Sequence, residues 1–288
     1  YATAIGTNGL VLSVGGLVAN ARPGGSLKAL DIESNSTSFS PRLRYALTRG
    51  RVTSTYLETG LSLNYSRTTL LGSELTLDRS SVLDAAFSVV DNRWDGTTEG
   101  SIGVARGLEL LGANGHDALR PSVQGFTPGF TKLRVNLVRQ QRLPSQFSLQ
   151  ILGQGQWTAD KLLAGEQVFF GGIGLGRAYD TGAVIGDRGA GLLIELRRDI
   201  ALSQWPALLV SNLQVFLFSD YAYASLLANP KIGAAETSSW LHSVGVGLRF
   251  QTDAGLSVDF LVADARRAIQ STDPRRDPRV LLILTKNF

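Results

Sequence analysis

Apolar and polar side chains alternate along much of this chain with a period of two residues. Residues 147–157 show the pattern clearly, since one set of alternate positions is wholly apolar and the other carries mostly amides and hydroxyls. The same division recurs in residues 57–65, 132–137, 243–250 and 256–262. Because successive side chains of a β-strand point to opposite faces, each segment predicts a strand with one apolar and one polar face. We count about a dozen such segments, which predicts an all-β protein.

The lengths of the strands and of their connections separate a membrane barrel from a soluble sandwich, whose strands also alternate. Several segments run for about ten residues or more, close to the ~9 to 11 residues of a tilted membrane strand. Short connections are expected at residues 6–9, 48–51, 143–146 and 251–255, and longer ones at residues 112–129, 159–188, 224–238 and 266–278. Tight turns at one rim and long loops at the other are typical of an outer-membrane barrel. We therefore expect a transmembrane antiparallel up-and-down β-barrel that contacts the lipids of a bacterial outer membrane.

In such a barrel the apolar face contacts lipid and the polar face lines a lumen, the reverse of a soluble barrel. Aromatic residues near the predicted strand ends fit an interfacial girdle, namely Trp157, Tyr221, Tyr223, Trp240 and Phe250. The last expected strand, residues 279–288, ends on an aromatic residue, as is common in barrels delivered to an assembly machine. We therefore expect Phe288 to act as a C-terminal assembly signal read by barrel-assembly machinery, and Lys286 to extend toward the interface.

The composition argues against several other classes of protein. Hydrophobic residues make up 43% of the chain and charged residues 18%, below the ~25% of soluble domains. No apolar run approaches the ~18 residues of a membrane helix, and no cysteine is present to form disulfides or thiolate metal sites. The net charge of +4 is spread along the chain, so we expect no nucleic acid partner. No phosphate-binding motif is present, and we expect no cofactor.

A glycine-rich segment, residues 170–180, carries one arginine, Arg177, among residues too small to cover its charge. The segment lies in a long expected loop, residues 159–189, which is rich in glycine and poor in solubilising charge. We therefore expect this loop to fold into the lumen. Asp220 lies on the polar face of a downstream strand, and a carboxylate there needs a partner. We expect Asp220 to pair with Arg177.

These residues resemble the outer-membrane transporters of two-partner secretion, the haemolysin and filamentous-haemagglutinin exporters. In that family a V-R-G-Y/F motif at the tip of an inward hairpin loop carries an arginine that pairs with the aspartate of an F-x-D-x-G motif on the barrel wall. Arg177 and Tyr179 match the loop motif, and Phe218 and Asp220 match the wall motif. Supporting positions in the loop and on the wall are Gly171, Gly172, Asp180, Asp187 and Glu195.

The match has three departures, which leave the charges of both motifs in place. Gly176 stands where valine is usual, while Ala178 and Ala222 replace motif glycines. The resemblance nevertheless extends over essentially the whole chain. It implies a sixteen-stranded barrel preceded by two periplasmic POTRA domains, with Tyr1 inside the fourth strand. Residues 1–288 would then be a single barrel domain that lacks its first strands and both POTRA domains, although a self-contained twelve-stranded barrel also fits the count.

The resemblance further implies a function. A large, unfolded exoprotein would pass from the periplasm through the polar lumen to the cell surface, with or without activation on the way. The Arg177–Asp220 pair would hold the loop inside the barrel in the resting or assembly-competent state.

Two other classes of function stay open. A passive porin or a barrel-assembly protein would share the barrel, and the number of POTRA domains would distinguish assembly from secretion. An outer-membrane hydrolase is the alternative from another class, but the two histidines, His116 and His242, lie in no recognisable nucleophile motif. Asp273 and Asp277 lack the ligand spacing of a calcium site. We therefore expect neither catalytic residues nor a metal site.

Overall fold

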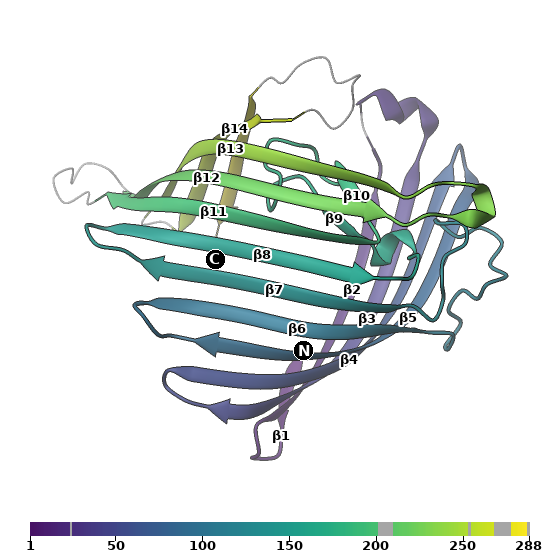
Figure 1. Ribbon diagram of the computed structural model, residues 1–288, viewed down its shortest axis with the longest axis horizontal. Helices are drawn as coiled ribbons and strands as arrows, with labels where there is room; N and C mark the ends of the chain where they lie inside the picture. Colours follow the sequence, from purple (N-terminus) through teal and green to yellow (C-terminus); the bar gives the residue numbers. More distant parts are fainter. Residues whose placement is uncertain (24, 201–209, 253–254, 268–277, 287–288) are drawn as a thin grey trace.

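The computed structural model describes residues 1–23, 25–200, 210–252, 255–267 and 278–286 (Figure 1). The strands are β1 Ala2–Ile5, β2 Leu10–Ala21, β3 Glu33–Arg49, β4 Thr53–Leu70, β5 Ser73–Asp91, β6 Gly96–Leu108, β7 Thr131–Arg142, β8 Phe147–Thr158, β9 Val168–Phe170, β10 Val184–Gly186, β11 Arg188–Ile200, β12 Val210–Leu226, β13 Thr237–Thr252, β14 Leu256–Ala265 and β15 Arg279–Lys286. Short 3-10 helices are η1 Gly25–Leu30, η2 Ala164–Glu166 and η3 Pro230–Ile232. In the part of the chain that the structure describes, no helix has the length and apolar character needed to cross a membrane.

Thirteen strands form one antiparallel sheet in the order β1 to β8 and then β11 to β15. Each strand pairs with its neighbours in sequence, except that β8 pairs with β11 because β9 and β10 form a separate hairpin. The sheet curves strongly, so that β2 to β5 lie behind β6, β7, β8 and β11, with the β9–β10 hairpin between the two walls (Figure 1). The expected up-and-down β-barrel architecture is confirmed. Within the described residues, β1 and β15 are the two edges of the sheet.

The two faces of the sheet have the expected opposite characters. In β7, Leu133, Val135 and Leu137 are 40% to 47% exposed on the face away from the hairpin, whereas Lys132 on the other face is buried. Large apolar side chains are exposed in the same alternating way on other strands, for example Leu192, Ile194, Leu196, Leu217, Val280, Leu282 and Leu284. A continuous apolar surface of this kind is unusual on a soluble monomer and fits contact with lipid.

Connections at the two rims differ in length largely as expected. The links β1–β2, β3–β4, β5–β6 and β7–β8 are short, whereas β6 and β7 are joined by a long loop. One tight turn interrupts the long-loop rim, because Leu71 and Gly72 alone join β4 to β5 with φ values of 50° and 78°. β3, β4 and β5 have 17, 18 and 19 residues, so they exceed the ~9 to 11 needed to cross a bilayer and project beyond it. Most of residues 266–278 and part of residues 251–255 lie outside the described residues.

Aromatic side chains lie near both ends of the strands. Trp157, Tyr221 and Tyr223 are 39% to 56% exposed near the long-loop rim. The Tyr221 and Trp240 rings lie 5.4 Å apart on neighbouring strands. Phe250 lies near the other end of β13, at the short-turn rim. This distribution matches the interfacial girdle expected from the sequence.

Candidate functional site

The link between β8 and β11, residues 159–187, folds back over the polar inner face of the sheet and is called the inward loop here. It contains the β9–β10 hairpin, in which Phe170 pairs with Val184. Phe170 and Leu175 are buried against wall residues Leu193 and Phe216. The main apolar core of the described chain therefore lies between the inward loop and the wall formed by β11 to β14.

Glycines set the backbone of the loop tip, residues 171–183. Gly171 and Gly172 have φ values of 114° and 91°, and Gly176 has a φ of 91°, a region that side chains disfavour. A Cβ atom at Gly171 would lie 2.1 Å from the carbonyl oxygen of Asp180, so this position excludes any side chain. The residue of the motif with a positive φ is Gly176, and Ala178 has none. The alanine that replaces the motif glycine therefore fits here without strain.

Asp220 on β12 binds the backbone of the loop tip. Its Oδ1 accepts the N–H of Gly176 at 3.0 Å, and its Oδ2 accepts the N–H of Arg177 at 3.3 Å. Ser243, opposite Asp220 on β13, accepts the N–H of Ala178 through its hydroxyl at 3.2 Å. The wall thus holds three consecutive N–H groups of the tip. Asp220 itself is 1% exposed, so these donors replace the water that an ionised carboxylate needs.

The guanidinium of Arg177 pairs with Glu195 on β11 rather than with Asp220, so the expected direct ion pair was wrong. The distance from Nη1 of Arg177 to Oε2 of Glu195 is 2.7 Å. The reason is geometric: both carboxylates face inward on adjacent strands, and Asp220 is already occupied by backbone donors, so the side chain reaches the next acid along the wall. The Arg177 guanidinium also lies 4.5 Å from the ring centre of Phe218, an arrangement that favours cation–π attraction.

Two further arginines lie beside the Glu195 carboxylate. Arg197, two residues along β11, places its Nε 2.6 Å from Oε1 of Glu195. Arg249 on β13 places Nη1 3.6 Å from the same oxygen and also pairs with Asp259. Glu195 is fully buried, and a lone buried carboxylate would be strongly unfavourable. The sequence placed Glu195 on the wall, but the alternating pattern did not indicate which arginine it meets.

Tyr179 and Asp180 connect the tip to the last strands. The Tyr179 hydroxyl donates to the carbonyl of Arg267 at 2.7 Å and accepts the N–H of His242 at 3.3 Å. Arg279 on β15 donates to the carbonyl of Tyr179 and lies 3.1 Å from Oδ1 of Asp180. Asp180 is almost fully exposed, so its ion pair contributes little. Sequence reasoning missed Arg279 because the interaction joins residues a hundred positions apart.

Asp187 closes the base of the inward loop. Its Oδ1 accepts the N–H of Leu162 and the side-chain amide of Gln167, both at 3.0 Å. Its Oδ2 accepts the N–H of Leu227 at 2.9 Å, and Nζ of Lys161 lies 3.5 Å away. The side chain is fully buried. Asp187 therefore ties the start of the loop, its middle and the β12–β13 connection to one carboxylate.

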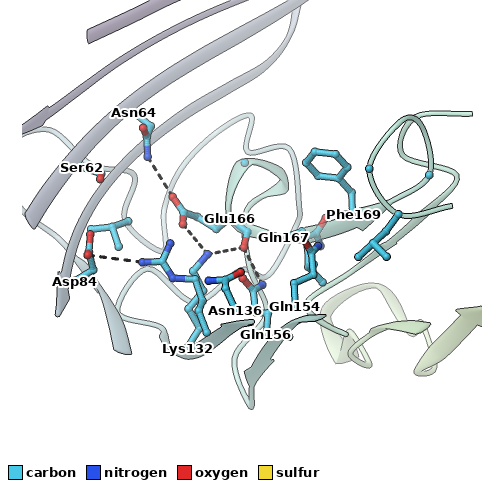
Figure 2. A pocket seen from close by; sticks show the side chains of 18 of the residues that line it. Ser62, Asn64, Asp84, Lys132, Asn136, Gln154, Gln156, Glu166, Gln167 and Phe169 are labelled. Atoms are coloured by element: carbon cyan, nitrogen blue, oxygen red, sulfur yellow. Dashed lines mark hydrogen bonds and ion pairs between the residues drawn. The ribbon is translucent and has the colours of Figure 1, made fainter. Parts of the chain in front are cut away.

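A second charged anchor, not predicted from the sequence, fixes η2 of the loop to the opposite wall (Figure 2). Nζ of Lys132 on β7 donates to the backbone carbonyl of Glu166 at 2.7 Å and to its Oε2 at 3.0 Å. Ser80 and Asn64, on β5 and β4, donate to Oε1 at 2.9 and 3.3 Å. Lys132 stood out as a cation on a polar strand face, but nothing in the spacing pointed to Glu166 as its partner.

A cavity of about 620 Å³ lies between the inward loop and the wall beside this anchor. The wall side carries mostly polar side chains, whereas Phe169 and Ile173 line it from the loop (Figure 2). Among the described residues, no group of acidic, histidine or cysteine side chains is arranged to hold a metal ion. The sequence-predicted Phe288, and Asp273 and Asp277 with it, lie outside the described residues.

Most of the chain is similar in sequence to one known protein family and to its curated relatives. The model of a family described as haemolysin secretion/activation protein ShlB/FhaC/HecB matches residues 18–250. The heme/hemopexin transporter protein HuxB of Haemophilus influenzae strain 86-028NP is 25% identical over 248 residues, which cover 83% of this chain and 42% of HuxB. The chain therefore spans less than half the length of this relative.

Solved structures show the same fold. CdiB from Escherichia coli matches with a TM-score of 0.72 and 16% identity, over 96% of this chain and 49% of CdiB. BamA from Haemophilus ducreyi, solved without POTRA domains 1–3, matches with a TM-score of 0.65 and 13% identity, over 99% of this chain and 61% of BamA. At these identities the likeness establishes the fold alone.

Proposed function

The chain belongs to the haemolysin secretion/activation protein family ShlB/FhaC/HecB, and from that membership we propose that it forms the wall of an outer-membrane pore that exports a large partner protein. The partner would enter unfolded from the periplasm and leave at the cell surface. Members of this family are outer-membrane β-barrels, and the lipid-facing apolar surface of this sheet fits that location.

The observation that carries the proposal is the attachment of the inward loop to the polar wall. Asp220 and Ser243 bind its backbone, and Glu195 binds the Arg177 guanidinium. These contacts hold the loop tip against β11, β12 and β13. Such a loop occupies space on the inner face that an exported polypeptide would need, so we propose a conformational role for Arg177, Asp220 and Glu195. They set the position of the loop in the resting or assembly-competent barrel.

We further propose that the described sheet is one part of a larger closed barrel. Its edge strands β1 and β15 have no partner on one side among the described residues. Unpaired backbone N–H and C=O groups in lipid cost several kcal/mol each, on the order of the transfer penalty of a peptide group. Additional strands that pair with β1 and β15 would satisfy both edges, and POTRA domains would precede them, as the family resemblance implies.

The alternatives differ in their support. The likeness to BamA covers nearly the whole chain, so the fold also fits barrel assembly. For a hydrolase, one contact is relevant: Oγ of Ser219 lies 3.2 Å from Nε2 of His242 on the lipid-facing side. Within the described part of the chain no carboxylate hydrogen-bonds to this ring, whereas an activated serine usually has a base oriented by a third group. His116 is exposed in the β6–β7 loop. We propose transport without enzymatic activity.

The decisive experiment measures export of the partner exoprotein by cells that carry the full-length transporter. Wild type is compared with Arg177→Ala and Asp220→Ala at matched amounts of folded barrel in the outer membrane. Lost export with normal barrel insertion supports the transporter and the role of the loop. Unchanged export in both variants, together with reduced insertion of other outer-membrane barrel proteins, would favour the assembly alternative.

A further inference from the structure

We propose that the cavity between the inward loop and the wall is a binding site for an extended segment of the exported polypeptide that carries no basic residue. This inference rests on the proposed export function and assigns a contact site to the cargo. The cavity measures about 620 Å³, which suits a short peptide segment and excludes a folded domain. Its lining combines paired carboxylates, the free side-chain amide of Gln154 and exposed apolar side chains, and each of these features limits the ligand.

The carboxylates that line the cavity already have basic partners. Glu166 pairs with Lys132 at 3.0 Å. Asp84 receives two hydrogen bonds from Arg42, at 3.0 and 3.1 Å, and lies 3.8 Å from Nη2 of Arg134. Two carboxylates therefore face three cations, and Arg134 is the cation in excess. A basic cargo segment would find no unpaired carboxylate among these groups, so the electrostatics disfavour basic residues in the bound segment.

One amide side chain on the wall is available to an extended peptide. Gln154 and Gln156 both lie on the inner face of β8, but Nε2 of Gln156 already donates to the carbonyl oxygens of Glu166 and Asp187, both at 3.0 Å. Asn136 on β7 lies directly opposite Gln154. The side-chain amide of Gln154 makes no hydrogen bond to other described residues, although it offers both a donor and an acceptor. Such an amide can bind peptide N–H and C=O groups whatever the side chains of the cargo.

Apolar side chains complete the cavity from the loop. Phe169 and Ile173 line it and are 57% and 65% exposed, although the inward loop lies on the polar face of the sheet, away from lipid. Phe170, the next residue, is buried in the core, so strand alternation directs Phe169 to the opposite side of the hairpin. Exposed apolar side chains beside the free amide of Gln154 can bind the side chains and the backbone of one extended chain together.

The test uses a photo-reactive benzoylphenylalanine in place of Phe169 in the full-length transporter during export of its partner exoprotein. The matched control carries the same residue at Phe87, a lipid-facing phenylalanine of β5 that is 41% exposed. We expect a covalent adduct with the exoprotein from position 169 and none from position 87. If export proceeds but position 169 yields adducts only within the transporter, or none, the inference is wrong. Failure of the unmodified transporter to export the exoprotein would instead overturn the proposed function.

A second variant tests the amide contact itself. Replacing Gln154 by leucine removes both hydrogen-bonding groups while keeping a similar volume, and we expect export to slow by about two- to tenfold, the range expected for one lost hydrogen bond. The adduct yield at position 169 should fall in parallel at an unchanged amount of folded barrel. An unchanged export rate together with an unchanged adduct yield would show that Gln154 does not contact the cargo.

Discussion

The backbone N–H of Arg177 donates to Oδ2 of Asp220 at 3.3 Å, while the guanidinium of the same residue extends to Glu195, 2.7 Å away. One residue of the loop is therefore held by two acids of the wall in two different ways. The backbone contact depends on a carboxylate at position 220 and hardly on the side chain at position 177. The guanidinium contact depends on both side chains. These two dependences can be separated by mutation.

Exchanging the charges of Arg177 and Asp220 should fail to restore the wild-type loop. An arginine at position 220 cannot accept the N–H groups of Gly176 and Arg177, and an aspartate at position 177 would face Glu195. We expect Asp220→Asn to keep part of the function, because its amide oxygen still accepts one of the two N–H groups. Export at matched barrel levels is the readout. Full recovery in the exchanged double variant would contradict the backbone contact.

Arg177 and Glu195 should show direct energetic coupling. Each partner of a buried charged hydrogen bond loses a contact worth about 1.5 to 3 kcal/mol when the other is removed. A double-mutant cycle of Arg177→Met and Glu195→Gln checks this in denaturant unfolding of the full-length barrel in detergent. Arg197 remains 2.6 Å from Glu195 in the Arg177→Met variant. The free energy of unfolding lost in this variant should therefore be smaller than the cost of burying a carboxylate with no partner. Additive effects of the two substitutions would exclude the pairing.

Gly171→Ala should displace the loop tip. Its new methyl group would meet the carbonyl of Asp180 at 2.1 Å, and a φ of 114° adds strain of about 1 to 3 kcal/mol. Gly174→Ala is the matched control in the same loop, because a Cβ atom there meets nothing within 4 Å. The chain has no cysteine, so a thiol introduced at Ile173 reports loop position through its labelling rate with a membrane-impermeant maleimide. The rate should change with Gly171→Ala and stay unchanged with Gly174→Ala.

Glu166 should hold the base of the loop independently of the tip. Glu166→Leu leaves Lys132 buried without a carboxylate partner, and such an uncompensated buried charge costs about 3 to 5 kcal/mol. The combined change Lys132→Met and Glu166→Leu removes both charges and should recover most of that loss. Thermal unfolding of the detergent-solubilised barrel measures the difference. A double variant as unstable as Glu166→Leu would show that the neutral hydrogen bonds around this anchor matter more than the ion pair.

Neighbouring positions on β7 should differ in their tolerance of the same substitution. Leu137→Lys places an ammonium on the lipid face near the middle of the strand, at a cost of about 2 to 4 kcal/mol near the bilayer midplane. Asn136→Lys places it on the polar inner face, where water and polar groups solvate it. The folded fraction on heat-modifiability gels should fall for the first variant and stay near wild type for the second. Equal behaviour would contradict the assignment of the two faces.

The architecture could be predicted from the sequence because the deciding signals are local. The period of two follows from the geometry of a single strand, so the alternation in residues 132–137 and 147–157 already separated the lipid face from the inner face. The glycines around Arg177 marked a backbone that side chains would obstruct, and the tight turns at one rim set the antiparallel order. The Arg177, Tyr179, Phe218 and Asp220 matches indicated the family without any knowledge of contacts.

The partners of the buried charges were decided only by the tertiary structure. Glu195 and Asp220 both face inward on adjacent strands, and spacing along the chain cannot tell which one the Arg177 side chain reaches. Lys132 and Glu166, or Tyr179 and Arg279, meet only because the sheet curves and the loop folds across it. Strand periodicity is a property of neighbouring residues, whereas these contacts depend on the path of the whole chain, and so the sequence determined the faces of the barrel but not the pairs that hold its loop.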